Sequence, residues 1–181
     1  LINIAALNEE MKKGLFLVLI IANLFLVACA KQQPSPPAAM PSVLLMPDEI
    51  EWTEAPPSLP PGAKIAVIED DGLKNKEPQK NQGQPFTFRL LLPINYKIAS
   101  HTHPTSEHVT VISGMFYFGE GNEFVIEDAK AYPPGSVIIM PPGKPMFGFT
   151  KDQEVIIQVH GVGPWNIKYS NPSDDPRPLQ P

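Results

Sequence analysis

Proline is the residue that most restricts what this chain can fold into. The sequence has 23 prolines among 181 residues, well above the usual frequency of about 5%. A proline inside a helix removes a hydrogen bond and costs about 3 kcal/mol. The composition therefore disfavours long helices and coiled coils, and we expect extended segments joined by turns.

The region after the last proline cluster has the pattern of a β-sheet protein. Short runs rich in Val, Ile, Phe and Tyr alternate there with turn residues such as those of Pro133-Pro134-Gly135. The expected strands are residues 63–68, 86–92, 109–112, 115–118, 136–140, 155–160 and 165–169. Short strands at nearly regular spacing predict an all-β sandwich or small barrel, in a single domain. The one helical candidate, residues 127–131, is too short to be stable alone.

The amino-terminal region has the pattern of a secretory signal. Lys12 and Lys13 precede the apolar run 14–28, which is shorter than the ~20 residues needed to span a bilayer. The sequence Leu-Val-Ala-Cys that ends at Cys29 resembles the lipobox of bacterial lipoproteins. This resemblance implies cleavage before Cys29 and a diacylated, membrane-tethered product, since stable anchoring needs more than one acyl chain.

These signals divide the chain into five segments. We expect residues 1–10 to be an upstream segment preceding the natural start at Met11, and residues 11–28 to be the lipoprotein signal peptide. Residues 29–61 are a proline-rich, polyproline-like tether, because proline lacks a donor and favours extended backbone. Residues 62–171 form the barrel and residues 172–181 a proline-rich tail.

A cluster of histidines gives the chain its candidate chemistry. His101 and His103 are two residues apart, so on a strand their side chains share a face. Glu107 follows a turn begun by Pro104 and can return a carboxylate to the same point, whereas its neighbour His108 should then point away. Two imidazoles and one carboxylate suit non-haem Fe(II), and also Mn(II), Zn(II) or Ni(II).

The same residues resemble the sequence motifs of the cupins. His101, His103, Glu107 and Gly114 match the pattern H-x-H-x3-E-x6-G, and Gly135, Pro141 and Gly143 match most of G-x5-P-x-G-x2-H. The closing segments 159–165 and 171–172 are also similar to small single-domain cupins of unassigned function. The resemblance implies a double-stranded β-helix (jelly-roll barrel), frequent homodimers, and a divalent metal held by three histidines and one glutamate.

The chain departs from this pattern at Met146, which stands where the second motif has its histidine. A thioether is a soft ligand that suits Cu(I) better than Fe(II) or Mn(II). Three accounts are open: His101, His103 and Glu107 bind metal with waters; His160 or His108 supplies the missing imidazole; or the barrel is degenerate and binds metal weakly or not at all.

The length of one turn decides whether the side chains of His160 and Met146 lie on the same face of the sheet. With a two-residue hairpin turn at Lys151-Asp152, His160 lies on the opposite face from Met146; with a three-residue turn the two share a face. Short hairpins of both lengths are common, so both remain open.

Charge completes the functional expectation. The net charge is −5 and the 14 Lys and Arg residues are not clustered, which excludes a nucleic-acid-binding surface. We expect a lipid-anchored cell-envelope protein, on the periplasmic face of the outer membrane in a Gram-negative cell. It would bind a mononuclear divalent metal and a small-molecule ligand, as an oxygenase-type enzyme; the alternative is a non-catalytic ligand- or metal-binding module.

Overall fold

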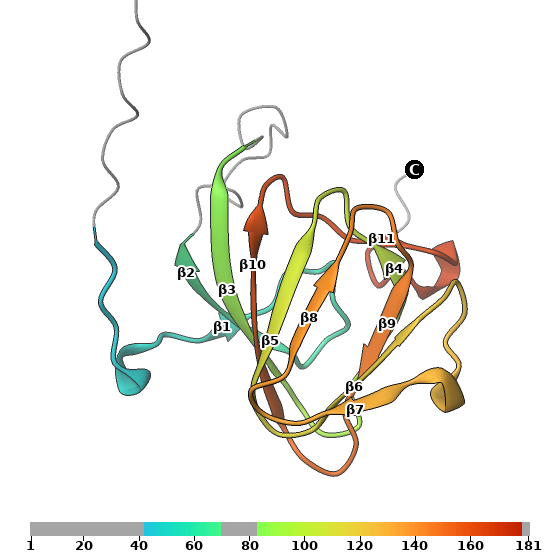
Figure 1. Cartoon of the computed structure of the whole chain (residues 1–181), viewed down its shortest axis with the longest axis horizontal. Coiled ribbons are helices and arrows are strands. Elements are labelled where there is room, and N and C mark those ends of the chain that lie inside the picture. Colours follow the sequence, from blue (N-terminus) through green and yellow to red (C-terminus); the bar gives the residue numbers. More distant parts are fainter. Residues whose placement is uncertain (1–41, 70–82, 179–181) are drawn as a thin grey trace, which may run out of the picture. The chain divides into compact units, whose positions relative to one another are not determined.

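Two antiparallel β-sheets face each other in the computed structural model, which describes residues 42–69 and 83–178 (Figure 1). The six-stranded sheet has the order β1-β2-β3-β10-β5-β8, and the five-stranded sheet the order β11-β4-β9-β6-β7. The first sheet contains β1 (Thr53–Glu54), β2 (Lys64–Glu69), β3 (Pro85–Leu92), β5 (Glu107–Ser113), β8 (Val137–Met140) and β10 (Val155–Val162). The second contains β4 (Lys97–Thr102), β6 (Phe116–Glu120), β7 (Lys130–Tyr132), β9 (Met146–Phe149) and β11 (Lys168–Tyr169).

The core lies between the sheets because the strands alternate buried and exposed side chains. In β3, Phe86, Phe88, Leu90 and Leu92 are buried while the residues between them are partly exposed, as the period of two predicts. Gly114, between β5 and β6, has a φ of +75°, and a Cβ there would lie 2.3 Å from the backbone oxygen of Glu154. Only glycine fits this turn, so the strand ends there as the sequence indicated.

The carboxyl-terminal part of the expected tether belongs to the barrel. Within residues 29–61, β1 pairs with β2, and the side chain of Leu59 is buried in the core. The hydroxyls of Tyr96 and Tyr169 donate hydrogen bonds to the backbone oxygens of Pro60 (2.5 Å) and Ser58 (2.8 Å). Proline-rich backbone lacks donors but keeps its carbonyl acceptors, so the barrel begins before residue 62.

The expected hairpin between Met146 and His160 is wrong in both of its versions. β9 pairs with β4 and β6, whereas β10 pairs with β3 and β5. The segment containing Lys151 therefore crosses from one sheet to the other and is not a hairpin turn. Residues that follow one another in the chain are not paired here because each sheet takes strands from both halves of the sequence.

Three short 3₁₀ helices complete the described residues: η1 (Pro47–Glu49), η3 (Ile126–Asp128) and η4 (Pro172–Asp174). The helical candidate at 127–131 is a 3₁₀ turn followed by β7, and the last expected strand shrinks to β11. No helix in residues 42–69 and 83–178 is long and apolar enough to cross a membrane. The upstream segment, the signal peptide and Cys29 lie outside the described residues.

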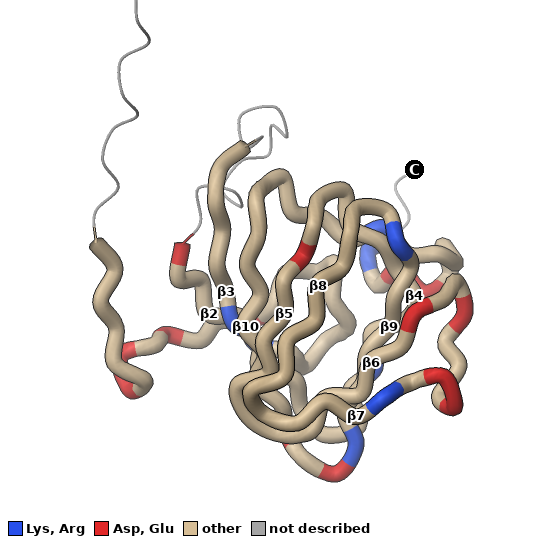
Figure 2. Tube along the Cα trace, viewed as in Figure 1, with Lys and Arg blue, Asp and Glu red and all other residues tan. Residues whose placement is uncertain are grey.

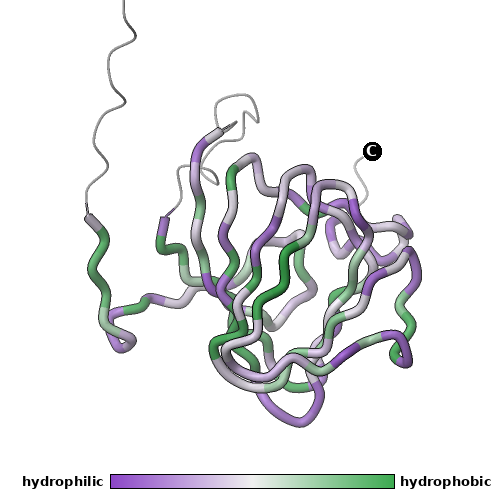
Figure 3. The backbone as a smooth tube through the Cα atoms, viewed as in Figure 1, coloured by the Kyte–Doolittle hydropathy of each residue, from purple (hydrophilic) through white to green (hydrophobic). Residues whose placement is uncertain are grey.

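Charge is unevenly distributed over the two sheets. Figure 2 shows most charged residues in loops and around β6 and β7, whereas Glu107 is the single Asp, Glu, Lys or Arg within β5, β8 and β10. Figure 3 shows β8 as strongly hydrophobic, and its Val137 and Ile139 are 60% and 59% exposed. Arg89 is half-buried on β3, and its Nε donates a hydrogen bond to Oε1 of Gln158 at 3.1 Å.

Candidate functional site

A small cavity of about 40 Å³ lies within the barrel and has mostly apolar walls. Leu90, Val109, Phe116, Ile157 and similar residues line it, and its titratable residues are His101, His103 and Glu107. In β6, Phe116 lines the cavity, whereas the ring of its neighbour Tyr117 stacks on Phe149. The volume has room for a few water molecules or a hydrated ion, but it is far below the ~300 Å³ of a typical ligand pocket.

Strand β4 and the residue after it bring both histidines inward. The pairing of β4 with β9 is shifted between Ile98 and His101, as in a β-bulge, and such an extra residue re-aims the side chains that follow. His101 is 6% exposed and His103 is 5% exposed. The prediction that the two imidazoles share a face is confirmed, and their ring centres lie 4.9 Å apart.

Backbone carbonyls fix the tautomer of each imidazole. Nδ1 of His101 lies 2.7 Å from the oxygen of Ala99, and Nδ1 of His103 lies 2.7 Å from the oxygen of Asn166. A carbonyl oxygen only accepts hydrogen bonds, so each Nδ1 carries the hydrogen and each Nε2 keeps a free lone pair. This is the arrangement that metal-binding histidines use, with the second nitrogen held by a backbone acceptor.

Burial keeps both imidazoles neutral. Burial, and to a smaller extent the neighbouring His103, lower the pKa of His101 from 6.5 to about 4. Burial likewise lowers the pKa of His103 to about 4. At neutral pH neither ring needs to lose a proton before it binds a cation.

Glu107 lies at the start of β5, where its side chain points inward and that of His108 points outward, as predicted. One oxygen, Oε1, accepts a 2.9 Å hydrogen bond from Nε1 of Trp165. The other, Oε2, lies 3.3 Å from Nε2 of His103. Burial raises the pKa of the Glu107 carboxyl, although the hydrogen bond from Trp165 opposes the rise.

The contact between His103 and Glu107 lacks a positive partner. Nε2 of His103 is buried and has no hydrogen-bond partner, and Oε2 of an ionised Glu107 is likewise a lone-pair donor. Two such atoms at this distance need either a proton or a cation between them. Two ligand atoms bound to one ion at about 2.0–2.1 Å in a tetrahedral arrangement lie roughly 3.3 Å apart. The distance between these two atoms therefore matches that of two ligands on one metal ion.

The third candidate ligand, the imidazole of His101, does not complete a metal-binding set with His103 and Glu107. Among residues 42–69 and 83–178, no group of three or more His, Cys, Asp or Glu side chains has the arrangement of a metal site. His101 lines the cavity, but a three-ligand centre requires its imidazole to turn toward the His103–Glu107 edge.

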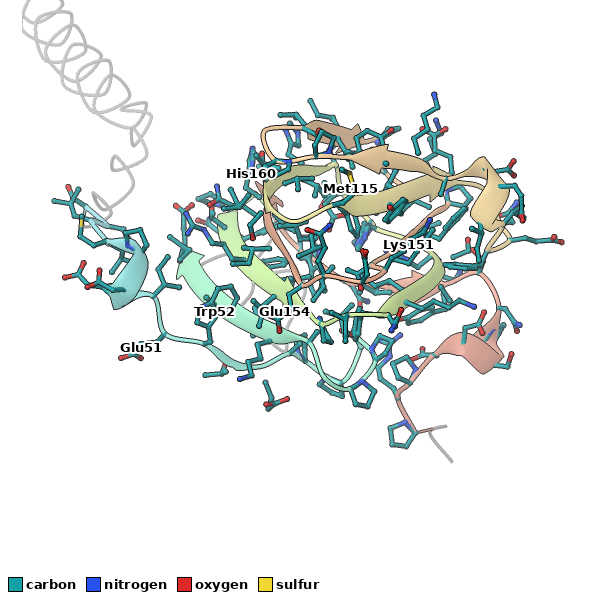
Figure 4. All side chains as sticks on the ribbon, turned by 90° about the horizontal axis from the view of Figure 1, so that it is seen from below. Glu51, Trp52, Met115, Lys151, Glu154 and His160 are labelled. Atoms are coloured by element: carbon teal, nitrogen blue, oxygen red, sulfur yellow. The ribbon has the colours of Figure 1, made fainter. Side chains whose placement is uncertain are left out.

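The two candidates for a fourth ligand lie on different sides of the barrel wall. Met146 lines the cavity, is 1% exposed and pairs directly with His101 in the sheet. His160 is exposed on the outer face of β10, opposite His108 of β5 (Figure 4). The structure therefore does not bring His160 or His108 to the cavity, whereas the thioether of Met146 lines it.

Trp165 is the functional residue that the sequence reasoning missed. We expected a strand there, but Trp165 lies in the irregular segment before β11. Its ring stacks on His103 with centres 5.7 Å apart and packs edge-on against Phe88 at 5.0 Å. The sequence carries no signal for this contact, because the position of the Trp165 ring depends on the path of the loop and not on a strand period.

Comparison with known proteins identifies the fold. No protein-family model matches the sequence, and no curated protein matches it either. The polyketide cyclase RemF from Streptomyces resistomycificus superposes with a TM-score of 0.55 at 14% identity, over 74% of this chain and 88% of RemF. An RmlC-like cupin protein from Ralstonia eutropha superposes with a TM-score of 0.53 at 13% identity, over 73% of this chain and 74% of that one. The chain is an all-β protein with the cupin-type double-stranded β-helix fold.

Proposed function

We propose that the barrel interior binds one divalent metal ion through His103, Glu107 and His101. The observation that carries this proposal is the close approach of two buried ligand atoms, Nε2 of His103 and Oε2 of Glu107, which lie 3.3 Å apart while Nε2 has no hydrogen-bond partner. Both histidines present Nε2 in the correct tautomer. Nitrogen and carboxylate donors together suit Fe(II), Mn(II), Zn(II) or Ni(II).

The neighbouring residues prepare these three side chains for a cation. The carbonyl of Asn166 holds the imidazole of His103 in place, and Trp165 holds the far oxygen of the carboxylate. The carbonyl of Ala99 fixes the tautomer of His101. Burial raises the pKa of the Glu107 carboxyl, and a bound cation would lower this pKa and displace the proton. The apolar walls around them exclude bulk water, which strengthens each electrostatic contact.

We further propose an enzyme of the oxygenase type that acts on a small oxygen-bearing molecule. A divalent cation in such a site supplies Lewis-acid or redox chemistry. The cavity is small and apolar, so a small substrate fits it better than a polar or extended one. The fold is shared with RemF, which is named a polyketide cyclase; this is an analogy of fold, and fold alone does not assign an activity.

A non-catalytic binding module is the second candidate, and three observations favour it. The cavity has about 40 Å³ of free space, which leaves little room for a substrate beside a metal ion. Met146 places a soft, weakly basic ligand at the fourth position. Within the described residues that line the cavity, no titratable side chain other than the three metal-ligand candidates is present to act as acid or base.

We also propose that the protein is anchored in the cell envelope by lipid on Cys29. The support comes from the sequence: a basic flank, an apolar run of signal-peptide length and a small residue before the cysteine. The test is Cys29→Ser, which should leave the protein unprocessed or release it from the membrane fraction. Unchanged membrane partitioning of this variant would contradict the anchor.

Metal analysis of the full-length protein, purified without a histidine tag, tests the central proposal. After anaerobic loading with Fe(II) or Mn(II), we expect one equivalent in the native protein and none in His103→Ala. His108→Ala is the matched control, since it removes an imidazole from the outer face and should keep the metal. The absence of bound metal in the native protein would overturn the proposal.

Oxygen uptake by the loaded protein then separates the two functional candidates. Consumption of oxygen that depends on an added small substrate and is lost in His103→Ala supports the enzyme. A loaded protein that binds small ligands with no turnover supports the binding module.

A further inference from the structure

The two histidines outside the cavity form a pair of their own. His108 of β5 and His160 of β10 are direct partners in the antiparallel register. Their ring centres lie 4.9 Å apart and the ring planes are tilted by 46°. His160 is exposed and His108 is half-buried, so solvent reaches the pair from outside the barrel. In Figure 4, His160 lies on the outer side of the barrel wall.

The backbone beneath the pair is held in place on several sides. β10 lies between β3 and β5 in the sheet, and β5 is itself held on its other side by β8. Directly opposed residues of an antiparallel pair have Cβ atoms about 4.5–5.5 Å apart. The two imidazoles therefore stay adjacent without a ligand, and little conformational freedom is lost when a ligand binds both.

The side chains around the pair leave the imidazoles as its main donors. In the same row across the sheet, Thr87 faces His160 on one side and Ile139 faces His108 on the other. Glu69 lies one strand further and accepts a 3.2 Å hydrogen bond from the hydroxyl of Thr87. Among the described residues, neither imidazole of the pair takes part in a side-chain hydrogen bond or an ion pair with a carboxylate.

The geometry points to a second metal site, and we propose that His108 and His160 together bind a borderline divalent ion of the Cu(II), Ni(II) or Zn(II) class. Two imidazoles that bind one ion at about 2.1 Å hold their ring centres roughly 5 Å apart, which is the separation observed. Two nitrogen ligands on a surface favour ions in the order of Cu(II) above Ni(II) and Zn(II), and all of these above Mn(II). Water completes the coordination. This site is separate from the proposed inner centre and does not depend on it.

Retention on immobilised metal tests whether the pair is accessible. The chain contains four histidines, and the two in the cavity are buried and cannot touch a metal fixed to a support. We expect the untagged full-length protein to be retained on Cu(II) or Ni(II) held by iminodiacetate, and His160→Ala and His108→Ala to flow through. His101→Ala is the matched control and should be retained. Equal retention of His160→Ala and the native protein would overturn the proposal.

Titration with Cu(II) tests whether the two side chains act on one ion. Each single alanine variant should weaken the outer binding event at least tenfold, and the double variant should weaken it little further, because losing either imidazole already removes the chelate. The nitrogen couplings in the electron paramagnetic resonance spectrum should show two imidazoles in the native protein. Losses that add between the two variants would mean two independent single ligands and would contradict a shared site. Loss of the inner metal in His103→Ala leaves this outcome unchanged, so the two proposals fail separately.

Discussion

The barrel wall separates two histidine pairs that have the same spacing and different surroundings. The rings of His101 and His103 and those of His108 and His160 are both 4.9 Å apart. The inner rings are buried and each has Nδ1 bound to a carbonyl. The outer rings face solvent, with Thr87 and Ile139 as neighbours in the sheet.

The two pairs have the same ring separation, so their different burial must account for the differences in protonation and hydrogen bonding. Inside, a fixed tautomer and an unpartnered Nε2 beside a carboxylate create a site that needs a positive charge. Outside, water can satisfy either ring, so binding rests on the chelate alone. The inner pair should therefore influence the stability and pH response of the whole protein, whereas the outer pair should influence metal binding only.

The pH dependence of stability is the largest expected difference. Folding lowers the pKa of His101 and His103 from 6.5 to about 4. Between these values the unfolded chain takes up protons that the folded chain does not, so stability is full above about pH 6.5 and is lost as the pH falls toward 4. From pH 6.5 to 5 each histidine should cost about 2 kcal/mol of unfolding free energy. Urea unfolding of the metal-free protein measures this.

Glu107 acts in the opposite direction and offers the control. Its folded pKa is raised, so the folded chain keeps a proton above pH 4.5 that the unfolded chain releases, and this contribution to stability grows as the pH falls. Glu107→Gln removes the opposing effect and should make the loss between pH 6.5 and 5 steeper. His103→Ala should make it shallower. A loss of stability that is the same in all three proteins would show that the inner pair does not cause it.

Adding a third imidazole to each pair should tighten metal binding. Met146 pairs with His101 inside the barrel, and Ile139 pairs with His108 outside it. Met146→His should strengthen Mn(II) or Fe(II) binding about tenfold or more, and Ile139→His should do the same for Cu(II) or Zn(II). Calorimetric titration of both variants with both classes of metal measures these affinities. Tighter Mn(II) binding in Ile139→His, or an unchanged inner affinity in Met146→His, would break the proposed division of the two sites.

Removing one hydrogen bond from the inner site should have a smaller effect. Trp165→Phe keeps an aromatic ring beside His103 and Phe88 but removes the N–H that binds Glu107. A hydrogen bond to a charged group contributes about 1.5–3 kcal/mol, so inner metal affinity should fall roughly tenfold, with little change in the outer site. Unchanged inner affinity with a large loss of stability would make Trp165 a packing residue only.

The sequence was sufficient to predict which side chains point into the barrel, but it did not predict which strands pair with each other. Alternation placed Glu107 inside and His108 outside, and put both His101 and His103 on one face. These relations are local, since neighbouring side chains on a strand point to opposite faces. The cupin-type fold was indicated by the resemblance of the two sequence motifs, and it is confirmed.

The relations that failed are long-range. Whether His160 shares a face with Met146 depended on a hairpin that does not exist, because β9 and β10 belong to different sheets. The docking of Leu59 on the core and the contact of Trp165 with Glu107 join segments far apart in the chain. Periodicity reports which face a residue occupies and is silent on which strand lies beside it.

The smallest expected effect is that of the outer pair on stability. His108→Ala and His160→Ala remove exposed or half-buried side chains that lack partners among the described carboxylates, and such surface substitutions change unfolding free energy by at most about 0.5 kcal/mol. His103→Ala removes a buried ring that packs on Trp165, so it should cost at least about 1 kcal/mol from lost packing. Urea unfolding of the four single histidine variants at pH 7.5, without metal, compares the pairs directly. Equal losses from both pairs would mean that burial does not separate them, because the outer rings would then contribute as much to the fold as the inner ones.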